Sequence, residues 1–235
     1  MSISDIVAQV DVKLDQARAT LARSMAEPGD ACLTCSFQAE GVLLAKLASE
    51  IDRDIPVLFL DTGYHFQETL EYRDRIAGEF GLNLINLQPR TTVAEQERQR
   101  GLLYQSEPDL CCKMRKVEPL FEAVGQYRVW LTGLRREQAK SRAELEETAW
   151  FTLPGGKQVL KVAPLAEWTT RDVWYACEQL SIPLLPLYAQ GYSSIGCEPC
   201  TSRPTDPNDP RSGRWAGRKV ECGIHIQIAP APQVR

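Results

Sequence analysis

Short apolar stretches alternate with amphipathic stretches through the first half of the chain, and this alternation constrains the fold more than any other feature. The apolar stretches have the character of β-strands and lie at residues 31–36, 56–61, 82–87 and 127–131. Helix-like stretches lie between them, at residues 41–49, 66–80 and 113–124. Parallel strands need long crossover connections, which are usually helices. The sequence therefore predicts an α/β fold with a mostly parallel sheet flanked by helices.

Further elements are predicted outside this alternating region. Residues 3–26 and 169–180 repeat apolar side chains at spacings of three and four, which predicts two amphipathic helices. Thr92 and Glu95 have the spacing of a capping box that begins a helix. Residues 150–162 predict a hairpin around a central Pro-Gly-Gly turn.

The domain organisation follows from length and from a change in composition. The chain has 235 residues, enough for one domain with an ample core. From Thr201 onward, prolines and glycines interrupt any regular element. We therefore expect an α/β domain over residues 1–200 and a mobile C-terminal segment over residues 201–235. That segment contains Cys222, and a mobile segment with a reactive residue suits a lid.

Charge and composition exclude several classes of protein. The formal net charge of −4 argues against a general nucleic-acid or membrane surface, because such surfaces usually carry a cationic excess. No apolar run approaches the ~20 residues that span a bilayer, and the N-terminus lacks the pattern of a signal peptide. We therefore expect a cytoplasmic protein. In that reducing compartment the eight cysteines serve as ligands, catalysts or buried side chains rather than disulfides.

Polar residues follow three of the predicted strands. They lie in Ser36-Phe37-Gln38-Ala39-Glu40, Asp61-Thr62-Gly63 and Thr132-Gly133-Leu134-Arg135-Arg136. Sheets of this kind bind ligands beyond the carboxyl ends of their strands. The first loop leads into a helix N-terminus, which suits a phosphate, although it lacks the ending of a Walker A loop and by itself equally fits a plain connection.

Arginines near this edge indicate an anionic ligand. Arg135 and Arg136 follow an apolar strand, and Arg142 lies a few residues further on. A solvated charged face is the alternative, but the position at the ligand-binding edge favours anion binding. Arg211 and Arg214 add to this positive potential if the C-terminal segment folds back onto the domain.

Four cysteines form a candidate ligand set. Cys111 and Cys112 are adjacent, and Cys197 and Cys200 are spaced C-x-x-C. Four thiolates suit either a structural zinc ion or a four-iron cluster, and burial as small hydrophobic side chains is the third interpretation. Consecutive side chains diverge, which is awkward around one zinc ion but not around different irons of a cubane. We therefore favour a 4Fe-4S cluster.

The other cysteines differ in their surroundings. Cys32 and Cys35 lie in an apolar strand and Cys177 lies on a predicted helix, so we interpret all three as buried. Cys222 stands in a polar stretch near cationic residues, which lower a thiol's pKa, and it is a candidate nucleophile or else an incidental surface cysteine. His65 and His225 have no role that spacing assigns.

Five motifs together resemble those of the assimilatory sulfonucleotide reductases, over roughly residues 30–225. They are the Ser36–Glu40 loop, Leu60-Asp61-Thr62-Gly63-Tyr64-His65-Phe66, Cys111-Cys112 with Arg115-Lys116, Thr132 to Gln138, and the closing set from Cys197 to His225. Because five motifs match in the same order, we interpret the resemblance as a family relationship and not as a chance similarity. The resemblance implies an adenine-nucleotide α-hydrolase-like fold, related to the PP-loop proteins.

The cysteine pattern is similar to that of the family's thioredoxin-dependent, cluster-bearing adenylyl-sulfate branch. This implies reduction of adenosine 5′-phosphosulfate (APS) to sulfite and AMP, in sulfate assimilation and cysteine biosynthesis. Cys222 would attack the sulfate sulfur, and thioredoxin or glutaredoxin would resolve the thiosulfonate. The 4Fe-4S cluster on Cys111, Cys112, Cys197 and Cys200 would serve structure and electrostatic positioning rather than electron donation.

The resemblance also implies the substrate-binding residues. Ser36, Phe37, Gln38, Asp61, Thr62 and Gly63 match the adenosine side, and the phosphate and sulfate contacts match Lys116, Arg142, Arg211 and Arg214, with Arg135 on the same edge. Ala139 and Gln67 stand where the family's motifs more often have serine and proline.

Three alternatives remain from the sequence. One is a phosphoadenylyl-sulfate (PAPS) reductase that retains the cluster, and a second is a PP-loop ATP-pyrophosphatase of tRNA thiolation, whose S-G-G-x-D-S loop is absent here. The third is a zinc-stabilised nucleotide-binding module without enzymatic activity. The sequence does not assign an oligomeric state, and a homo-oligomer is compatible with it.

Overall fold

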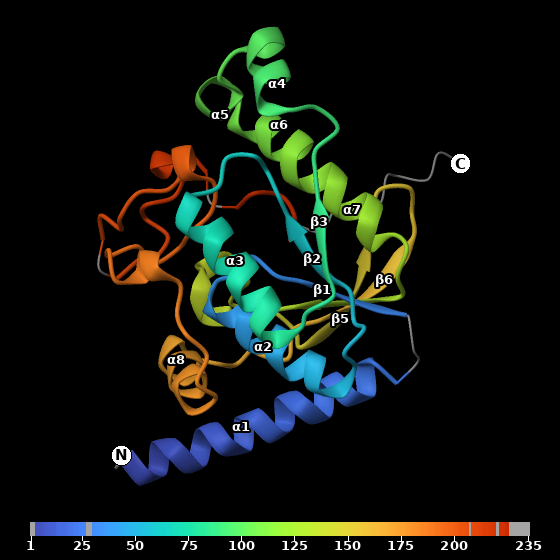
Figure 1. Ribbon diagram of the computed structural model, residues 1–235, viewed down its shortest axis with the longest axis vertical. Helices are drawn as coiled ribbons and strands as arrows, with labels where there is room; N and C mark the ends of the chain where they lie inside the picture. The colour runs from blue at the N-terminus through green and yellow to red at the C-terminus, as the bar shows by residue number, and fades with distance from the viewer. Residues whose placement is uncertain (1–2, 27–29, 207, 220, 226–235) are drawn as a thin grey trace.

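The structure is a computed structural model that describes residues 3–26, 30–206, 208–219 and 221–225. In these ranges a six-stranded sheet has the order β3-β2-β1-β4-β6-β5 (Figure 1). Its strands are β1 (Ala31–Thr34), β2 (Val57–Leu60), β3 (Leu84–Leu87), β4 (Val129–Thr132), β5 (Thr148–Thr152) and β6 (Gln158–Val162). All neighbouring pairs are parallel except β5 with β6, which form an antiparallel hairpin. The predicted α/β fold and the hairpin are confirmed.

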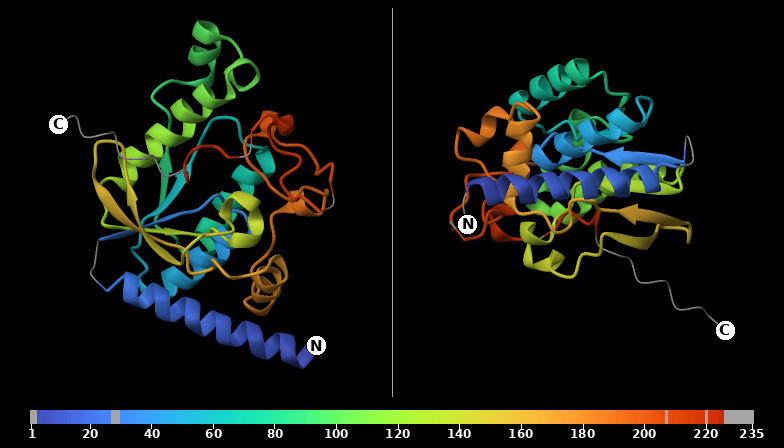
Figure 2. Two further views of the ribbon diagram at one scale, coloured as in Figure 1. Left: turned by 180° about the vertical axis from the view of Figure 1, so that it is seen from behind. Right: turned by 90° about the horizontal axis from the view of Figure 1, so that it is seen from below.

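Helices cover both faces of the sheet (Figure 2). The α-helices are α1 (Ile3–Ser24), α2 (Ala39–Ile51), α3 (Gln67–Phe80), α4 (Val93–Arg100), α5 (Leu103–Ser106), α6 (Pro108–Cys112), α7 (Glu118–Val124) and α8 (Thr170–Gln179). Short helices are η1 (Lys113–Val117, π-helical), η2 (Arg136–Gln138), η3 (Lys140–Arg142), η4 (Pro186–Tyr188), η5 (Glu198–Cys200) and η6 (Trp215–Gly217). The predicted capping box of Thr92 and Glu95 begins α4.

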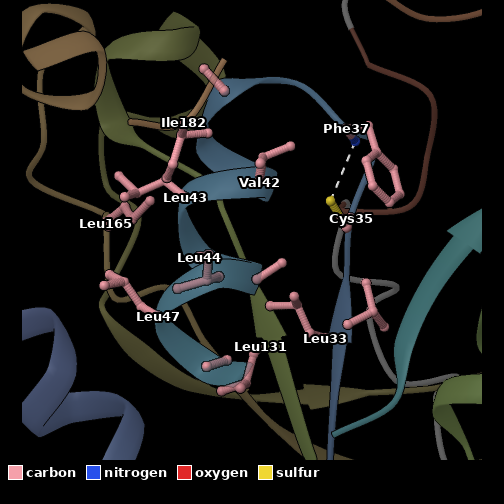
Figure 3. Close-up of a cluster of buried hydrophobic side chains, with 14 of the residues drawn as sticks. Leu33, Cys35, Phe37, Val42, Leu43, Leu44, Leu47, Leu131, Leu165 and Ile182 are labelled. Carbon is pink, nitrogen blue, oxygen red and sulfur yellow. Dashed lines mark hydrogen bonds between the residues drawn. The ribbon is translucent and has the colours of Figure 1, made fainter. Parts of the chain in front are cut away.

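The larger core lies between the sheet and the helices α1, α2, α3 and α8. Leu33 and Leu131 on adjacent strands and Leu43 and Leu44 of α2 belong to this core, and all four are fully buried (Figure 3). Cys35 lies in the same core, where its sulfur accepts a hydrogen bond from the amide of Phe37 at 3.3 Å. Burial raises the pKa of Cys35 to about 12, so this thiol is inert, as predicted.

A second core lies on the other face of the sheet. Because side chains alternate along a strand, Cys32, Leu58 and Trp130 point to this face while their neighbours point to the first core. Phe121 of α7 packs edge-on against Trp130, with ring centroids 6.4 Å apart. Ile224 belongs to the same cluster, so residues close to the C-terminus complete this core.

The chain beyond Cys200 returns to the domain. The amide of Ser202 donates to the carbonyl of Gly213 at 2.8 Å, which closes a loop in this segment. Trp215 then inserts into the protein and is 3% exposed. The described part of the C-terminal segment thus packs against the domain, whereas residues 226–235 lie outside the described ranges. Its predicted mobility stays a prediction. Among the described helices, none is both long and apolar enough to cross a membrane.

Candidate functional site

The loops that follow β1, β2 and β4 line a cavity of about 580 Å³ at the carboxyl ends of the parallel strands. This volume is in the range of small-molecule sites. Nine of the residues that the sequence predicted for the site line the cavity: Ser36, Gln38, Thr62, Lys116, Arg135, Arg142, Arg211, Arg214 and Cys222. The topology therefore brings together side chains from five separate parts of the chain.

Three other predicted residues support this edge without lining the cavity, as far as the described residues show. Phe37 has a φ of 56°, a left-handed conformation that turns the chain from β1 toward α2, and its ring is fully buried in the first core. Asp61 accepts the amide of Gly63 at 3.1 Å. Gly63 has a φ of 73°, and a Cβ there would lie 2.7 Å from Val93, so the turn requires glycine.

Gln38 ties two walls of the cavity together. Its side-chain oxygen accepts the amide of Ile195 at 2.9 Å, and its side-chain nitrogen donates to Ser36 Oγ at 3.2 Å. The loop after β1 is thereby fixed to the segment that leads to Cys197. This contact explains why a loop that is unremarkable in sequence has a defined conformation.

Arg135 is buried and fully engaged with protein acceptors. Its side chain is 3% exposed, and Nε and Nη2 donate to Glu40 Oε1 at 3.0 and 2.6 Å. Nη1 donates to Glu137 Oε2 and to the carbonyl of Trp168, and Nη2 also donates to Thr170 Oγ1. These contacts account for all five N–H donors of a guanidinium. The geometry favours a structural role for Arg135 at the cavity wall over direct anion binding.

Four other cations surround the cavity. Arg214 stacks on Trp215, with its guanidinium carbon 4.4 Å from the ring centroid, and it donates to Ser194 Oγ at 3.4 Å. Arg211 donates to the same hydroxyl at 3.4 Å. Burial lowers the pKa of both arginines, although an arginine stays charged at neutral pH. With Lys116 and Arg142, they place four cationic side chains on the cavity wall.

Cys222 lies in this cationic wall. It is partly buried and packs at the edge of the second core, beside Ile224. Burial acts to lower the pKa of Lys116, but the nearby thiols of Cys197 and Cys222 outweigh it, so that the pKa of this lysine is raised. Lys116 is therefore an ammonium ion at neutral pH. It lines the cavity that contains Cys222 and also a smaller cavity that contains the four candidate ligand cysteines.

The four candidate ligand cysteines line a second, smaller cavity. Cys111 and Cys112 come from α6, Cys197 precedes η5 and Cys200 is its last residue. Trp215 and Lys116 are among the other residues that line this cavity. Burial, followed by the negative charge of the three other thiols, raises the pKa of Cys111 to about 11, which reflects how closely the four gather.

The four thiols could hold a four-iron cluster. Among the described residues, no three Cys, His, Asp or Glu side chains are arranged to hold one metal ion. A cubane binds each thiolate through a different iron, so four thiols around a shared cavity suit it without converging on one point. Thr62 Oγ1 also lies 3.3 Å from Cys197 Sγ, as a hydrogen-bonding group next to a cluster ligand does.

Glu221, which lines the cavity, and Lys161, which lies outside its lining, have no assigned role among the sequence predictions. Glu221 accepts hydrogen bonds from Arg142 and Arg211, and Lys161 lies with its ammonium 4.9 Å from the ring centroid of Trp130. Glu221 reaches Arg142 only because the C-terminal segment docks on the domain, so no local sequence pattern predicts this contact. His225 also reaches the cavity and stacks on Trp130 at 5.6 Å.

By its sheet and the position of its cavity, the chain is an α/β protein of the class that binds ligands at the carboxyl ends of parallel strands. Residues 30–203 match the family described as "Phosphoadenosine phosphosulfate reductase domain". The chain belongs to this family.

Curated relatives extend the match over most of the chain. An adenosine 5′-phosphosulfate reductase of Streptomyces coelicolor is 44% identical over 196 residues, which cover 83% of this chain and 81% of the relative. A protein of the same name from Geobacillus kaustophilus is 42% identical over 210 residues, which cover 88% of each. The resemblance to the sulfonucleotide reductases is confirmed.

Solved structures share the fold. A phosphoadenylyl-sulfate reductase from Candida auris, crystallised as a phosphate complex, superposes with a TM-score of 0.68 at 23% identity, covering 86% of this chain and 98% of that one. A Candida glabrata FMN adenylyltransferase bound to FMN and an ATP analogue gives a TM-score of 0.62 at 16% identity, covering 87% and 70%. At these identities the likeness concerns the fold alone.

Proposed function

We propose that this protein reduces adenosine 5′-phosphosulfate to sulfite and AMP through a covalent thiosulfonate on Cys222. One observation carries the proposal: Cys222 shares its cavity with Lys116, Arg142, Arg211 and Arg214. A thiol among four cations suits attack on a doubly anionic phosphosulfate. The name shared by the curated relatives supports this substrate.

In the first step the Cys222 thiolate attacks the sulfate sulfur. The new bond joins Cys222 Sγ to that sulfur, and the bond from sulfur to the bridging oxygen of the phosphate breaks. AMP leaves with the electron pair of that bond, and the enzyme retains a thiosulfonate. The guanidinium and ammonium groups stabilise the charge that develops on the departing phosphate.

In the second step a reduced dithiol protein, of the thioredoxin or glutaredoxin type, resolves the thiosulfonate. Its thiolate attacks Cys222 Sγ, sulfite leaves with the electron pair of the S–S bond, and a mixed disulfide remains. The partner's second thiolate then attacks the partner's first sulfur in the mixed disulfide, and the bond from that sulfur to Cys222 Sγ breaks. This step releases the Cys222 thiol and leaves the partner oxidised to a disulfide. This reductant must reach Cys222, so the residues around Cys222 have to open toward solvent after the first step.

The adenosine end fits the loops after β1 and β2. Ser36, Gln38 and Thr62 line this part of the cavity, while Asp61 and Gly63 hold the turn beside it. Phe37 supports the loop from the core, so its contribution is to backbone position. Arg135 holds Glu40 and the strand-end loop in place through its ion pair.

We assign a 4Fe-4S cluster to Cys111, Cys112, Cys197 and Cys200. When bound, it supplies a fixed electrostatic centre that joins α6 to η5. The chain's own contribution is Lys116, whose ammonium lies between these thiols and Cys222 and holds positive charge at the sulfate end of the cavity. The purified protein should be brown and contain iron and sulfide in equal amounts, and Cys200→Ser should lose both.

The decisive experiment incubates the enzyme with adenosine 5′-phosphosulfate in the absence of any reductant. Intact-mass analysis followed by peptide mapping should show one added sulfonate, on Cys222. Cys222→Ser should show none, whereas Cys177→Ala, which removes a buried thiol of the first core, should be labelled like the wild type. A sulfonate on any other residue would contradict the mechanism.

The family's description and the Candida auris structure both name the 3′-phosphorylated nucleotide, which makes PAPS the second candidate substrate. Specificity is a ratio of kcat/KM values, so both nucleotides are compared under single-turnover conditions. We expect a higher kcat/KM for adenosine 5′-phosphosulfate. The reverse ratio would assign the chain to PAPS reduction and leave the Cys222 chemistry unchanged.

Further proposals concern the setting of the reaction. We assign the enzyme to sulfate assimilation and the formation of sulfite for cysteine biosynthesis, in the cytoplasm. Sulfite release on addition of thioredoxin, and slower release with glutaredoxin, would identify the reductant. Light scattering of the purified protein decides between a monomer and a homo-oligomer.

A further inference from the structure

The carboxylate of Glu221 occupies two of the arginines that the proposed function assigns to the substrate. Arg142 Nε and Nη2 donate to its two oxygens at 2.8 and 2.9 Å, which is a bidentate pair. Arg211 Nη2 donates to Oε2 at 3.2 Å, and the hydroxyl of Ser141 donates to Oε1 at 3.2 Å. Glu221 thus satisfies an anion site with four hydrogen bonds from three side chains.

The site is shielded from water. The side chains of Glu221, Arg142 and Arg211 are 9, 11 and 17% exposed. Burial acts to raise the pKa of Glu221, but hydrogen bonds from Arg142 and the charges of both arginines outweigh it and hold the pKa below its usual value. The side chain is therefore an anion at neutral pH. A guanidinium fork that holds a carboxylate in this way has the same donor geometry for sulfate or phosphate oxygens.

We propose that Glu221 is a built-in competitor of the substrate, whose carboxylate must leave Arg142 and Arg211 before a sulfate or phosphate oxyanion can bind there. This inference rests on the proposed function for the identity of that oxyanion. The exchange keeps the local charge nearly balanced, because one anion leaves as another arrives. The arginines are therefore compensated in the free protein as well as in the complex.

The position of Glu221 next to Cys222 gives the exchange a second effect. Because the two residues are adjacent, a backbone movement that withdraws the Glu221 carboxylate also moves Cys222. Gly223 has a φ of 93°, which a residue with a side chain rarely adopts, and it provides a turn at which the segment can change direction. Substrate binding and the placement of the Cys222 thiol are thereby coupled through one ion pair.

The contrasting role for Glu221 is that of a permanent support that holds both arginines in their binding positions. The two roles predict opposite effects of removing the charge. A competitor lowers oxyanion affinity, so its removal raises that affinity. A support raises oxyanion affinity, so its removal lowers it.

The test measures binding of inorganic sulfate by isothermal titration calorimetry to the intact protein and to Glu221→Gln. Hydrogen bonds to charged groups contribute enough that release of this competition should tighten sulfate binding by about tenfold. The matched control is Glu167→Gln, which removes the same charge from an exposed residue that pairs with Arg136 on the surface. This control should bind sulfate like the wild type.

Unchanged or weaker sulfate binding by Glu221→Gln would overturn the inference. If circular dichroism shows that Glu221→Gln is unfolded, Glu221→Asp replaces it, since a shorter side chain keeps the charge but loses the bidentate contact and should also bind sulfate more tightly. The proposed function is measured separately, as sulfonate transfer from adenosine 5′-phosphosulfate to Cys222. Tighter sulfate binding without sulfonate transfer would reject the function and leave this inference standing.

Discussion

Arg135→Met tests whether this arginine supports the cavity wall or binds substrate. The substitution keeps much of the side-chain length but removes five hydrogen bonds, two of them to Glu40. Glu40 is 15% exposed, so it would become a mostly buried carboxylate without its cation. Removing one partner of a buried ion pair costs about 3–5 kcal/mol. For a chain of this length, that corresponds to a fall in Tm of roughly 6–20 °C.

The assay is thermal denaturation followed by circular dichroism at pH 7, in parallel with sulfate titration. Glu40→Gln alone should cost less, because an amide still accepts a hydrogen bond from Arg135. The double variant Arg135→Met with Glu40→Gln should be more stable than Arg135→Met, because the unpaired carboxylate is then gone. If Tm falls by less than about 2 °C while sulfate affinity falls strongly, this reasoning is refuted and Arg135 is a substrate ligand.

Three further predictions follow from the same structure. Burial lowers the pKa of His65 to about 4, so below pH 6.5 the unfolded chain binds more protons than the folded protein, and Tm should fall as the pH falls from 6.5 toward 4. The fall in Tm should be smaller in His65→Asn. The same dependence of Tm on pH in both proteins would contradict the assignment. Burial likewise lowers the pKa of Lys161 to about 8, so the charged lysine destabilises the folded protein below pH 8. Lys161→Met should therefore raise Tm at pH 7, and this increase in Tm should disappear by about pH 10.5. Gly196→Ala would place a Cβ in steric conflict with the Arg214 guanidinium and should weaken sulfate binding. Unchanged sulfate affinity would show that the position of Arg214 is not needed for sulfate binding.

The sheet is predictable from sequence because each strand is a short apolar run between turn residues. The predicted strands at 31–36, 56–61, 82–87 and 127–131 fall on β1 to β4 with small differences at their ends. The loops that bind ligands in such sheets follow from the topology alone. The edge of the sheet at which the site forms was therefore predictable before any side-chain contact was known.

The path from α6 to α7 was not predictable in detail. The sequence indicates one helix over 113–124, and these residues are helical in the structure, with a π-helical turn over Lys113–Val117 between α6 and α7 that the sequence did not indicate. This turn is associated with Arg115, whose Nε donates to the carbonyl of Thr62 at 2.5 Å and whose Nη1 donates to Gln96 Oε1 at 3.1 Å. Such anchors join residues far apart in sequence, so no local pattern reports them.

The site shows the same division. Lys116, Arg142, Arg211 and Arg214 were identified from motifs, and the structure places all four at one cavity. The contact of Glu221 with Arg142 was missed because it exists only after the C-terminal segment docks. Residue types at strand ends are encoded locally, whereas their hydrogen-bond partners depend on the assembled fold.

The cavity of the four cysteines has a consequence for the chain as a polymer. Cys112 and Cys197 are separated by about 85 residues, and the sheet strands β4, β5 and β6 lie in that interval. A group that bridges the two cysteine pairs therefore closes a loop of chain that contains three of the six strands. On the chain-entropy description of cross-links, closing a loop of this length restricts the unfolded chain by about 4–5 kcal/mol. Since Cys197 and Cys200 follow all six strands in sequence, this loop closes only after the whole sheet has been synthesised.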